Sequence, residues 1–359
     1  MTADAKTLLI AGKKIGRGKT VDVELQVSQG YSGQEVGLPV RVLRGPKRGP
    51  VLLLTAAVHG DELNGTGIIR ELAMAPPFEL LRGSLILVPV VNILGFERGT
   101  RYLPDRRDLN RCFPGIAQGS LSSRVAHTVF NELIRKADYC VDFHTAAVHR
   151  TNFPNVRANL AVPEIERLAK AFGSPLIINH PGIKKSLRLE ASKAGHFTII
   201  LEAGGVSKVE PAVVELGVRG VSNVLLDFDM IAGERAEPAY QAVVDDTKWL
   251  RADRGGLLRF HGGPGDPVEK DQAIASVTSL MGRELDVLVA PRDGIIVGIT
   301  TLPAVKPGDP VCHLGFPRKG IRRIQKTLGK LPDESLHERL RSDLGSSVAV
   351  EPGEAPEKA

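Results

Sequence analysis

The pattern of hydrophobic and polar positions changes twice along this chain. Within the first fifty residues apolar and polar positions alternate, as in residues 21–27, which predicts antiparallel strands with one face in water. From Val51 onwards the apolar positions are continuous, and such runs are typical of strands that are buried on both faces. The runs cover residues 51–58, 85–91, 139–143, 175–178 and 197–201.

Amphipathic helical stretches separate these apolar runs. They cover residues 63–74, 122–136, 163–172 and 211–230. Buried strands that alternate with helices predict an α/β domain with a mixed central sheet flanked by helices. We assign this domain to residues 51–250, with residues 1–50 as a β segment packed on it.

The second change of pattern comes near Arg251. Residues 255–314 form short apolar runs separated by Gly and Pro, and the tetrapeptide Gly-Asp-Pro-Val occurs twice, at 265–268 and 308–311. This predicts a small C-terminal all-β barrel or sandwich over residues 251–334, built from two half-repeats. Residues 335–359 follow as a polar helix, with Ser335 at its N-cap, and a loose tail.

Composition excludes several classes of protein. The 359 residues are 42% hydrophobic and 25% charged, as in an ordinary globular protein, and no apolar run approaches the roughly 18 residues of a membrane span. The N-terminus lacks the apolar core of a signal peptide. Three widely spaced cysteines make no disulfide framework, which favours a cytoplasmic location. The net charge of +6 is spread among acidic residues and only 4% of residues are aromatic, which argues against nucleic-acid binding.

Histidine and carboxylate side chains follow two of the buried strands. His59 and Glu62 come after the first, and His144 ends the strand at 139–143. Ligands converge at the carboxyl ends of strands in open α/β sheets, and catalytic zinc takes three protein ligands of these types. We therefore predict one Zn²⁺ per chain on these residues, although cobalt and manganese accept the same donors. Asp142 projects to the same side as His144 and is expected to orient its imidazole.

Two further features complete the candidate site. Glu202 ends the apolar run 198–201, where burial of a carboxylate is costly unless function requires it. We therefore expect Glu202 to be the general base that takes a proton from the zinc-bound water. The loop 98–115 carries five arginines, and its Asn110–Arg111 pair suits a carboxylate, while another arginine could polarise a carbonyl. Of the remaining histidines, His149 and His196 are expected nearest to the mouth of the site.

Four motifs in order carry a family resemblance: His-Gly-Asp-Glu, Asp-Leu-Asn-Arg-Cys-Phe-Pro-Gly, Val-Asp-Phe-His-Thr and Leu-Glu-Ala-Gly-Gly. Together they resemble the succinylglutamate desuccinylase/aspartoacylase family, which implies a zinc carboxypeptidase-like fold. Matched residue by residue, the resemblance implies zinc ligands His59, Glu62 and His144, catalytic residues Glu202 and Arg101, and substrate-carboxylate binding by Asn110 and Arg111. Arg98 and Arg106 stay as alternatives to Arg101 for polarising the scissile carbonyl.

The chain departs from the family pattern in its C-terminal part. Aspartoacylase uses a tyrosine from its C-terminal domain, whereas the last tyrosine here is Tyr240, so aspartoacylase specificity is not expected. The β segment resembles a biotinyl/lipoyl-type barrel, but no lysine lies between Lys270 and Lys306, and Met281-Gly282 occupies the apex region. We expect this domain to form a lid or a wall that shapes the substrate pocket, and not to act as a carrier.

The sequence thus predicts a zinc-dependent hydrolase that removes an acyl group from an N-acyl amino acid or a related small carboxylate. The alternatives are a metallocarboxypeptidase acting on small peptides and a non-catalytic metal- or ligand-binding protein. We expect no nucleic-acid or membrane partner. The sequence does not decide whether the enzyme prefers amides or esters, or which acyl group it removes. It also leaves the oligomeric state open, with a homo-oligomer as one alternative.

Overall fold

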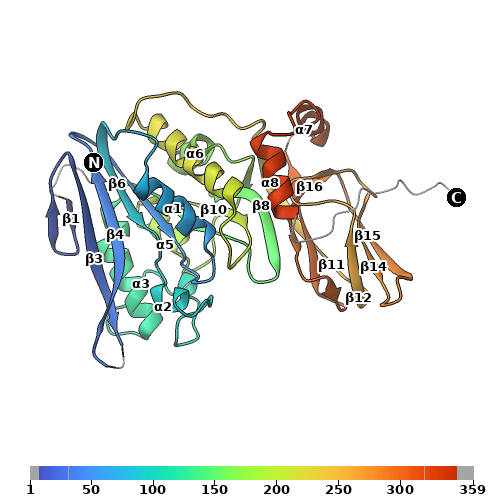
Figure 1. Ribbon diagram of the computed structural model, residues 1–359, viewed down its shortest axis with the longest axis horizontal. Coiled ribbons are helices and arrows are strands. Elements are labelled where there is room, and N and C mark those ends of the chain that lie inside the picture. The colour runs from blue at the N-terminus through green and yellow to red at the C-terminus, as the bar shows by residue number, and fades with distance from the viewer. Residues whose placement is uncertain (1–7, 31, 319, 346–359) are drawn as a thin grey trace.

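A mixed β-sheet runs through most of the molecule (Figure 1), in a computed structural model that describes residues 8–30, 32–318 and 320–345. This sheet has twelve strands in the order β13-β16-β18-β11-β9-β8-β10-β7-β5-β6-β4-β3. In chain order they are β3 (Lys19–Gln29), β4 (Glu35–Arg44), β5 (Lys47–Ala56), β6 (Arg82–Val88), β7 (Tyr139–His144), β8 (Arg150–Ala158), β9 (Leu176–Asn179), β10 (Phe197–Gly204), β11 (Ala242–Arg251), β13 (Pro267–Val268), β16 (Gly294–Thr300) and β18 (Pro310–Pro317).

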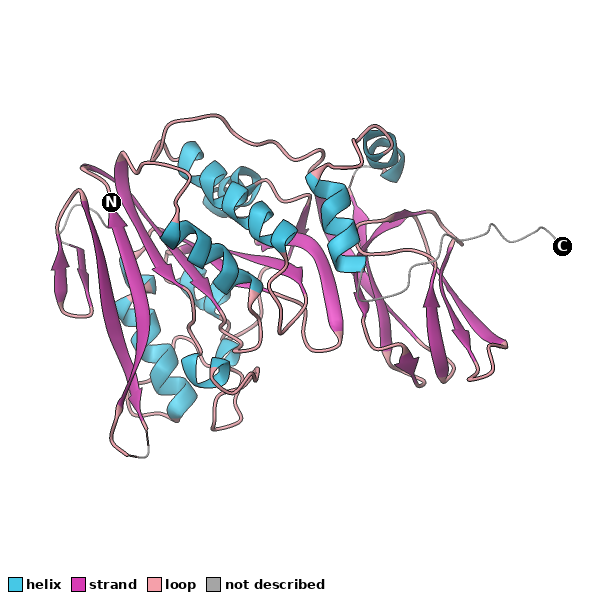
Figure 2. Ribbon diagram, viewed as in Figure 1, coloured by secondary structure: helices cyan, strands magenta, loops and turns pink. Residues whose placement is uncertain are grey.

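Helices cover both faces of this sheet (Figure 2). One face carries α1 (Asn64–Met74), α4 (Pro163–Phe172), α6 (Pro211–Asp227) and α8 (Leu336–Gly345). The other face carries α3 (Leu121–Glu132) and α5 (Leu187–Lys193). Shorter helices are α2 (Ile93–Phe96), α7 (Ile321–Leu328) and the 3₁₀ turns η2 (Leu109–Arg111) and η3 (Ile134–Lys136). The predicted α/β class is confirmed, while α5 and α7 were not expected from the sequence.

The continuous apolar runs are strands buried on both faces, as predicted. In β5, Leu52 and Leu54 face the core under α1 and α6, whereas Val51 and Leu53 face the core under α3. Successive side chains of a strand point to opposite faces, so a strand between two helical layers needs apolar residues at every position. In the N-terminal strand β3 only alternate residues are buried, which confirms the amphipathic pattern predicted there.

Strand β8 links the α/β part to the C-terminal part, and the sequence did not predict it. It lies between β9 and β10, and it also pairs with β16. Strands β8, β9, β11, β18 and β16 therefore close into a ring. Pro154 lies in the middle of β8, where proline is normally excluded; the pairing with β10 shifts register at this point. The sheet continues through β11 and β18, on both sides of the domain boundary predicted at residue 250. This boundary stays a prediction.

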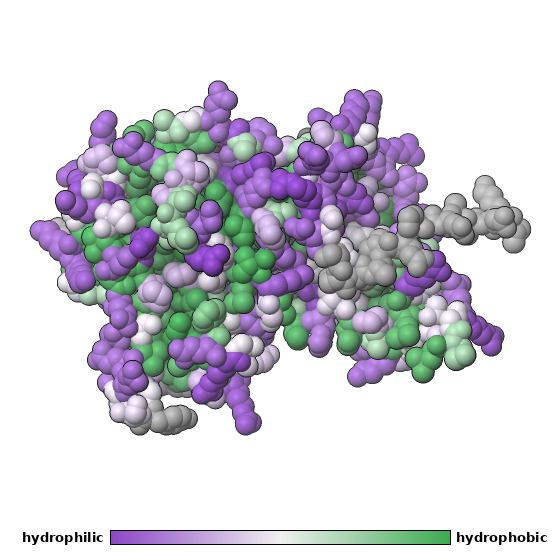
Figure 3. All heavy atoms as spheres, viewed as in Figure 1, coloured by the Kyte–Doolittle hydropathy of each residue, from purple (hydrophilic) through white to green (hydrophobic). Residues whose placement is uncertain are grey.

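A second, four-stranded antiparallel sheet forms the rest of the C-terminal part. It consists of β12 (Gly256–Phe260), β14 (Ala273–Thr278), β15 (Glu284–Val289) and β17 (Ala304–Val305), while β1 (Leu8–Ile10) and β2 (Lys13–Ile15) form a separate pair. Met281 lies in the turn between β14 and β15 and is 93% exposed. Apolar side chains are visible on the surface at this end of the molecule (Figure 3).

The start of α8 matches the sequence prediction. The Ser335 hydroxyl accepts a hydrogen bond from the Glu338 backbone N–H at 3.3 Å, which makes Ser335 the expected N-cap. The tail was predicted over residues 345–359; Gly345 is instead the last residue of α8, and residues 346–359 lie outside the described residues. Within the described part of the chain, none of the helices combines the length and the hydrophobicity required to cross a membrane.

Gly65 lets α1 approach the strands that carry the candidate site. A β carbon at Gly65 would lie 2.3 Å from Cβ of Phe143 and 2.8 Å from Cβ of Ala56. These are atoms next to the backbone of β7 and β5, so they move only if the strands move. Phe143 immediately precedes His144, and the close packing of α1 therefore bears directly on the position of that histidine.

We predict that Gly65→Ala lowers the free energy of unfolding by about 1–3 kcal/mol because of overpacking, although alanine favours a helix over glycine by about 1 kcal/mol. Urea denaturation measures the change. The matched control is Gly345→Ala in α8, where a β carbon meets nothing within 4 Å, so its stability should be equal or slightly higher. Equal stabilities of the two variants would contradict the packing argument.

Candidate active site

Two neighbouring parallel strands bring the predicted metal ligands together. β5 and β7 pair with Ala56 opposite Phe143, so the loop after β5, which carries His59 and Glu62, lies beside His144 at the end of β7. Each of the three offers one ligand atom, and these atoms all lie within 4.8 Å of one another. All three residues are buried. The structure thus contains a compact His-Glu-His metal site.

Both imidazoles turn the same nitrogen toward the Glu62 carboxylate. Nδ1 of His59 lies 2.7 Å from Oε1 of Glu62, and Nδ1 of His144 lies 2.9 Å from Oε2. The backbone N–H of Thr145 donates to the same Oε2 at 3.1 Å. With the Nδ1 atoms facing the centre of the site, the Nε2 atoms are left for partners on the outside.

Those outer partners are two aspartates. Nε2 of His144 lies 2.8 Å from Oδ2 of Asp142, and Asp142 in turn accepts a hydrogen bond from the Thr55 hydroxyl at 2.7 Å. Nε2 of His59 lies 3.2 Å from Oδ1 of Asp108. The contact of Asp142 is the one expected from the sequence, whereas Asp108 was missed, although it begins the Asp-Leu-Asn-Arg motif. Carboxylates in this position fix the tautomer and orientation of ligand imidazoles.

The electrostatics of the site favour a bound cation. Burial opposes ionisation of Glu62, but His59 and His144 nevertheless hold the pKa of that carboxyl below its ordinary value. Burial likewise opposes protonation of His144, yet Asp142 and Glu62 raise its pKa well above the usual range. Three carboxylates around two imidazoles therefore stabilise positive charge at this position, and nitrogen and oxygen donors of this kind suit Zn²⁺. The residues present fit a divalent metal ion.

Glu202 lies on the next strand of the sheet. In the parallel pairing of β10 with β7, Glu202 is directly opposite His144, so both side chains project to the same side. Its carboxylate accepts a hydrogen bond from Asn152 Nδ2 at 3.3 Å and forms an ion pair with Arg157 Nε at 3.6 Å. Asn152 and Arg157 belong to β8, and because the sequence did not predict that strand, neither residue was identified as part of the site.

The loop before α3 places the other predicted residues beside the metal site. Arg101 donates to Glu62 Oε1 at 2.9 Å and to Asp108 Oδ2 at 3.3 Å. Asn110 is buried, its Oδ1 accepts from the Leu187 N–H at 2.9 Å, and Arg111 follows it at the cavity wall. The alternatives Arg98 and Arg106 are both exposed.

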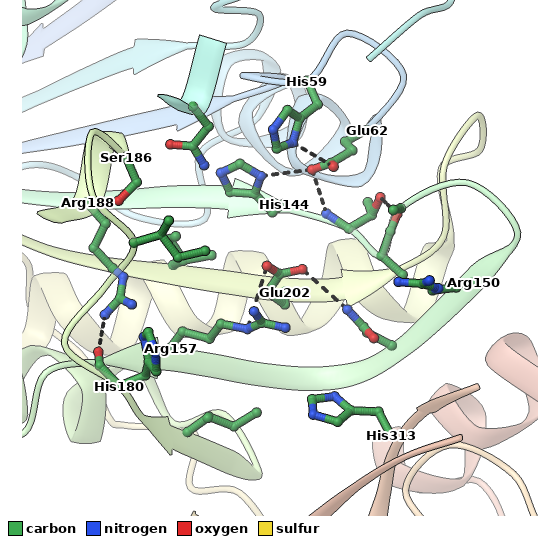
Figure 4. A pocket seen from close by; sticks show the side chains of 18 of the residues that line it. His59, Glu62, His144, Arg150, Arg157, His180, Ser186, Arg188, Glu202 and His313 are labelled. Carbon is green, nitrogen blue, oxygen red and sulfur yellow. Dashed lines mark hydrogen bonds and ion pairs between the residues drawn. The ribbon is translucent and has the colours of Figure 1, made fainter. Parts of the chain in front are cut away.

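One cavity of about 450 Å³ is lined by the three metal ligands together with Glu202, Arg101, Asn110 and Arg111 (Figure 4). Thr247, Trp249 and His313, from β11 and β18, form part of its wall. The lining residues are His59, Glu62, Arg101, Asn110, Arg111, His144, Thr145, Ala146, Ala147, Arg150, Asn152, Arg157, Ile178, His180, Ile183, Ser186, Arg188, Ile200, Glu202, Thr247, Trp249 and His313.

The additional histidines of the cavity are not the ones expected. His180 and His313 line it, whereas His149 and His196 do not, although His149 directly precedes the lining residue Arg150. His196 precedes β10, at the opposite end of that strand from Glu202, and its Nδ1 lies 2.8 Å from the Ala137 carbonyl oxygen. His313 was not predicted because the path of β18 past the cavity depends on the closure of the strand ring.

Comparison with known proteins agrees with this geometry. A curated relative, the N-alpha-acetyl-L-2,4-diaminobutyric acid deacetylase of Halomonas elongata, is 28% identical over 290 residues, which cover 77% of this chain and 84% of the relative. The product-bound structure of the ectoine utilization protein EutE (DoeB) from Ruegeria pomeroyi is 25% identical with a TM-score of 0.73, covering 84% of this chain and 96% of that chain.

A further solved structure and a family model point the same way. The succinylglutamate desuccinylase/aspartoacylase from Rhodobacter sphaeroides is 28% identical with a TM-score of 0.72, covering 84% of this chain and 95% of that chain. The family model for the succinylglutamate desuccinylase/aspartoacylase catalytic domain matches residues 48–227, which include the metal site and Glu202. The chain therefore belongs to the succinylglutamate desuccinylase/aspartoacylase family, and it is a deacylase of that family with a buried His-Glu-His metal site.

Proposed function

We propose that this deacylase uses Zn²⁺, held by His59, Glu62 and His144, to hydrolyse the amide bond of a small N-acyl amino acid. The observation that carries the proposal is the place of Glu202, a carboxylate in the same cavity as the metal site and directly opposite His144 in the sheet register. The Halomonas relative is named as a deacetylase of an N-acetyl amino acid, which supports this class of substrate.

The metal contributes one part of the chemistry: bound zinc lowers the pKa of a water molecule from 15.7 to about 7. Glu202, which faces the same cavity, would act as the general base that takes a proton from the attacking water molecule. Its hydrogen bond from Asn152 and its ion pair with Arg157 hold the carboxylate in place.

Arg101 stabilises the developing negative charge on the former carbonyl oxygen. Its guanidinium already lies beside the metal site through its contact with Glu62, and a preorganised donor of this kind is worth about 3 kcal/mol in the transition state. Glu202 then passes its proton to the leaving amine nitrogen as the C–N bond breaks. Water and amide are thereby converted into a carboxylic acid and a free amine.

Asn110 and Arg111 bind the carboxylate of the amino acid. Arg111 donates to the backbone carbonyl of Asn110 at 2.6 Å, and both residues line the cavity. Binding at this point fixes the scissile bond relative to Glu202, so binding energy is converted into orientation. The zinc ion itself, the cytoplasmic location and the oligomeric state stay predictions.

The function is tested with the zinc-loaded protein and a panel of N-acetyl, N-succinyl and N-formyl amino acids beside N-blocked dipeptides. We expect release of the acyl group and not of the C-terminal residue. Cleavage of the dipeptides alone would replace the proposal by a carboxypeptidase, and no turnover at full zinc occupancy would refute it.

Glu202→Gln should lower kcat by about 10²–10⁴-fold, the usual contribution of a general base. The amide keeps the size of the side chain and loses the proton acceptor. Bound zinc, measured by elemental analysis, should be unchanged because Glu202 is not a ligand. Glu97→Gln, at an exposed carboxylate outside the cavity, is the control, and equal kcat values for the two variants would remove Glu202 from this role.

Asp142→Asn should weaken zinc binding by about 10–100-fold, the range found when the outer partner of a ligand histidine is replaced. The affinity is measured by competition with a chelator. Asp245→Asn is the control, because Asp245 is an exposed partner of Arg318 and does not line the cavity. An unchanged affinity in Asp142→Asn would show that the contact with His144 does not matter for the metal.

Arg111→Lys should raise KM for N-acyl amino acids by about tenfold with little change in kcat, because an ammonium group cannot form the paired hydrogen bonds of a guanidinium. Steady-state kinetics separate the two constants. A fall in kcat with unchanged KM would instead place Arg111 at the reacting bond.

A further inference from the structure

The cavity carries far more positive than negative side chains. Its wall contains two carboxylates and five arginines, namely Glu62 and Glu202 against Arg101, Arg111, Arg150, Arg157 and Arg188. Both carboxylates already have partners: Glu62 contacts the two imidazoles and Arg101, and Glu202 contacts Asn152 and Arg157. The substrate therefore meets positive charge that the protein itself leaves uncompensated.

Arg150 is the clearest case of such a charge. It begins β8 and is partly buried, and no carboxylate among the described residues forms an ion pair with it. Its guanidinium lies over the ring of Trp249, 4.8 Å from the ring centroid. An arginine that faces a cavity without a carboxylate partner is suited to bind an anionic group of a ligand.

A stack of rings from the C-terminal part holds Arg150 in this position. The other partner of Trp249 is His313, whose ring is nearly parallel to it, with an interplanar angle of 4° and centroids 4.7 Å apart. Burial, with Arg157 and Arg150 nearby, lowers the pKa of His313 to about 3. The imidazole is therefore neutral near pH 7 and stacks on Trp249 without repelling the guanidinium.

Arg150 and the proposed carboxylate site lie on opposite sides of the cavity. Asn110 accepts a hydrogen bond from Leu187, the residue next to Ser186, and Figure 4 shows Ser186 and Arg150 at opposite ends, with Glu202 between them. A substrate whose α-carboxylate is bound by Asn110 and Arg111 can therefore place a second group near Arg150.

We propose that Arg150, positioned by Trp249 and His313, determines specificity by binding a second anionic group of the substrate. This inference rests on the proposed function, whose reaction centre lies between the two anion sites. The second group is a carboxylate on the amino-acid side chain or at the end of the acyl group. Since no free carboxylate lines the cavity, a cationic side chain, such as that of the diaminobutyrate derivative named for the Halomonas relative, is disfavoured.

Matched substrates test the proposal. A comparison of N-acetyl-L-glutamate with N-acetyl-L-glutamine tests for recognition of a carboxylate on the amino-acid side chain. A comparison of N-succinyl-L-alanine with its terminal amide tests for recognition of a carboxylate at the end of the acyl group. We expect kcat/KM to favour the acid over the amide by about tenfold or more in at least one pair, as for a charge-assisted hydrogen bond. The pair that shows the preference identifies the source of the second carboxylate. N-Acetyl-L-2,4-diaminobutyrate should be the poorest substrate.

Variants then assign the preference to residues. Arg150→Gln should bring acid and amide to within about threefold by raising KM for the acid, as expected when a charged partner is lost. Trp249→Leu should act in the same direction although Arg150 is intact, and Trp249→Phe, which keeps a ring under the guanidinium, should retain most of the preference. Arg322→Gln, at an exposed position on α7, is the control. Melting temperature and zinc content show that each variant is folded.

The outcomes separate this inference from the proposed function. Equal turnover of acids and amides by the unmodified enzyme, or a preference that survives Arg150→Gln, would overturn the role of Arg150 and leave the deacylase proposal intact. If no N-acyl compound is hydrolysed, the proposed function fails. The anion site at Arg150 is then tested on its own, by calorimetric comparison of succinate and succinamate binding to the zinc-loaded protein. Tighter binding of succinate that is lost in Arg150→Gln supports the anion site, and equal binding refutes it.

Discussion

The contact of one buried carboxylate with two imidazoles is the constraint on which the rest of the structure depends. Glu62 is buried with its oxygens beside Nδ1 of His59 and Nδ1 of His144. Burial of an ionised carboxylate is expensive unless compensating charges surround it. The parallel register of β5 and β7, together with the close approach of α1 at Gly65, supplies those partners at fixed positions.

The same register explains how the chemistry is divided between strands. β5 and β7 carry the metal ligands, and β10 carries the proposed base opposite His144. β8 carries the residues that surround this base and, at its start, Arg150. The antiparallel strands of the C-terminal part add the ring stack that holds Arg150. The metal ligands and the proposed specificity residue Arg150 thus lie on different strands.

Uncompensated arginines in the cavity have a cost in the free protein. Burial and the charge of Arg157 lower the pKa of Arg188 to about 10, the result expected where like charges meet in a poorly hydrated site. An anionic substrate removes that cost when it binds. The cavity is therefore organised to gain electrostatic energy from its ligand, which favours selectivity for charge as well as shape.

The local pattern of apolar and polar residues determined the α/β class and the ends of the buried strands. A strand between two helical layers must be apolar throughout, and a charged residue at its end is costly to bury unless function requires it. Hence His59, Glu62, His144, Glu202 and Asp142 could be found from the sequence. Only the tertiary structure identified Asp108, Arg150, Trp249 and His313 as neighbours of the site. β8 contains a proline and many polar residues, and the ring that joins it to β16 depends on pairing between residues about 150 positions apart, such as Arg150 and Thr300. Such long-range pairing leaves no periodic signal in the sequence.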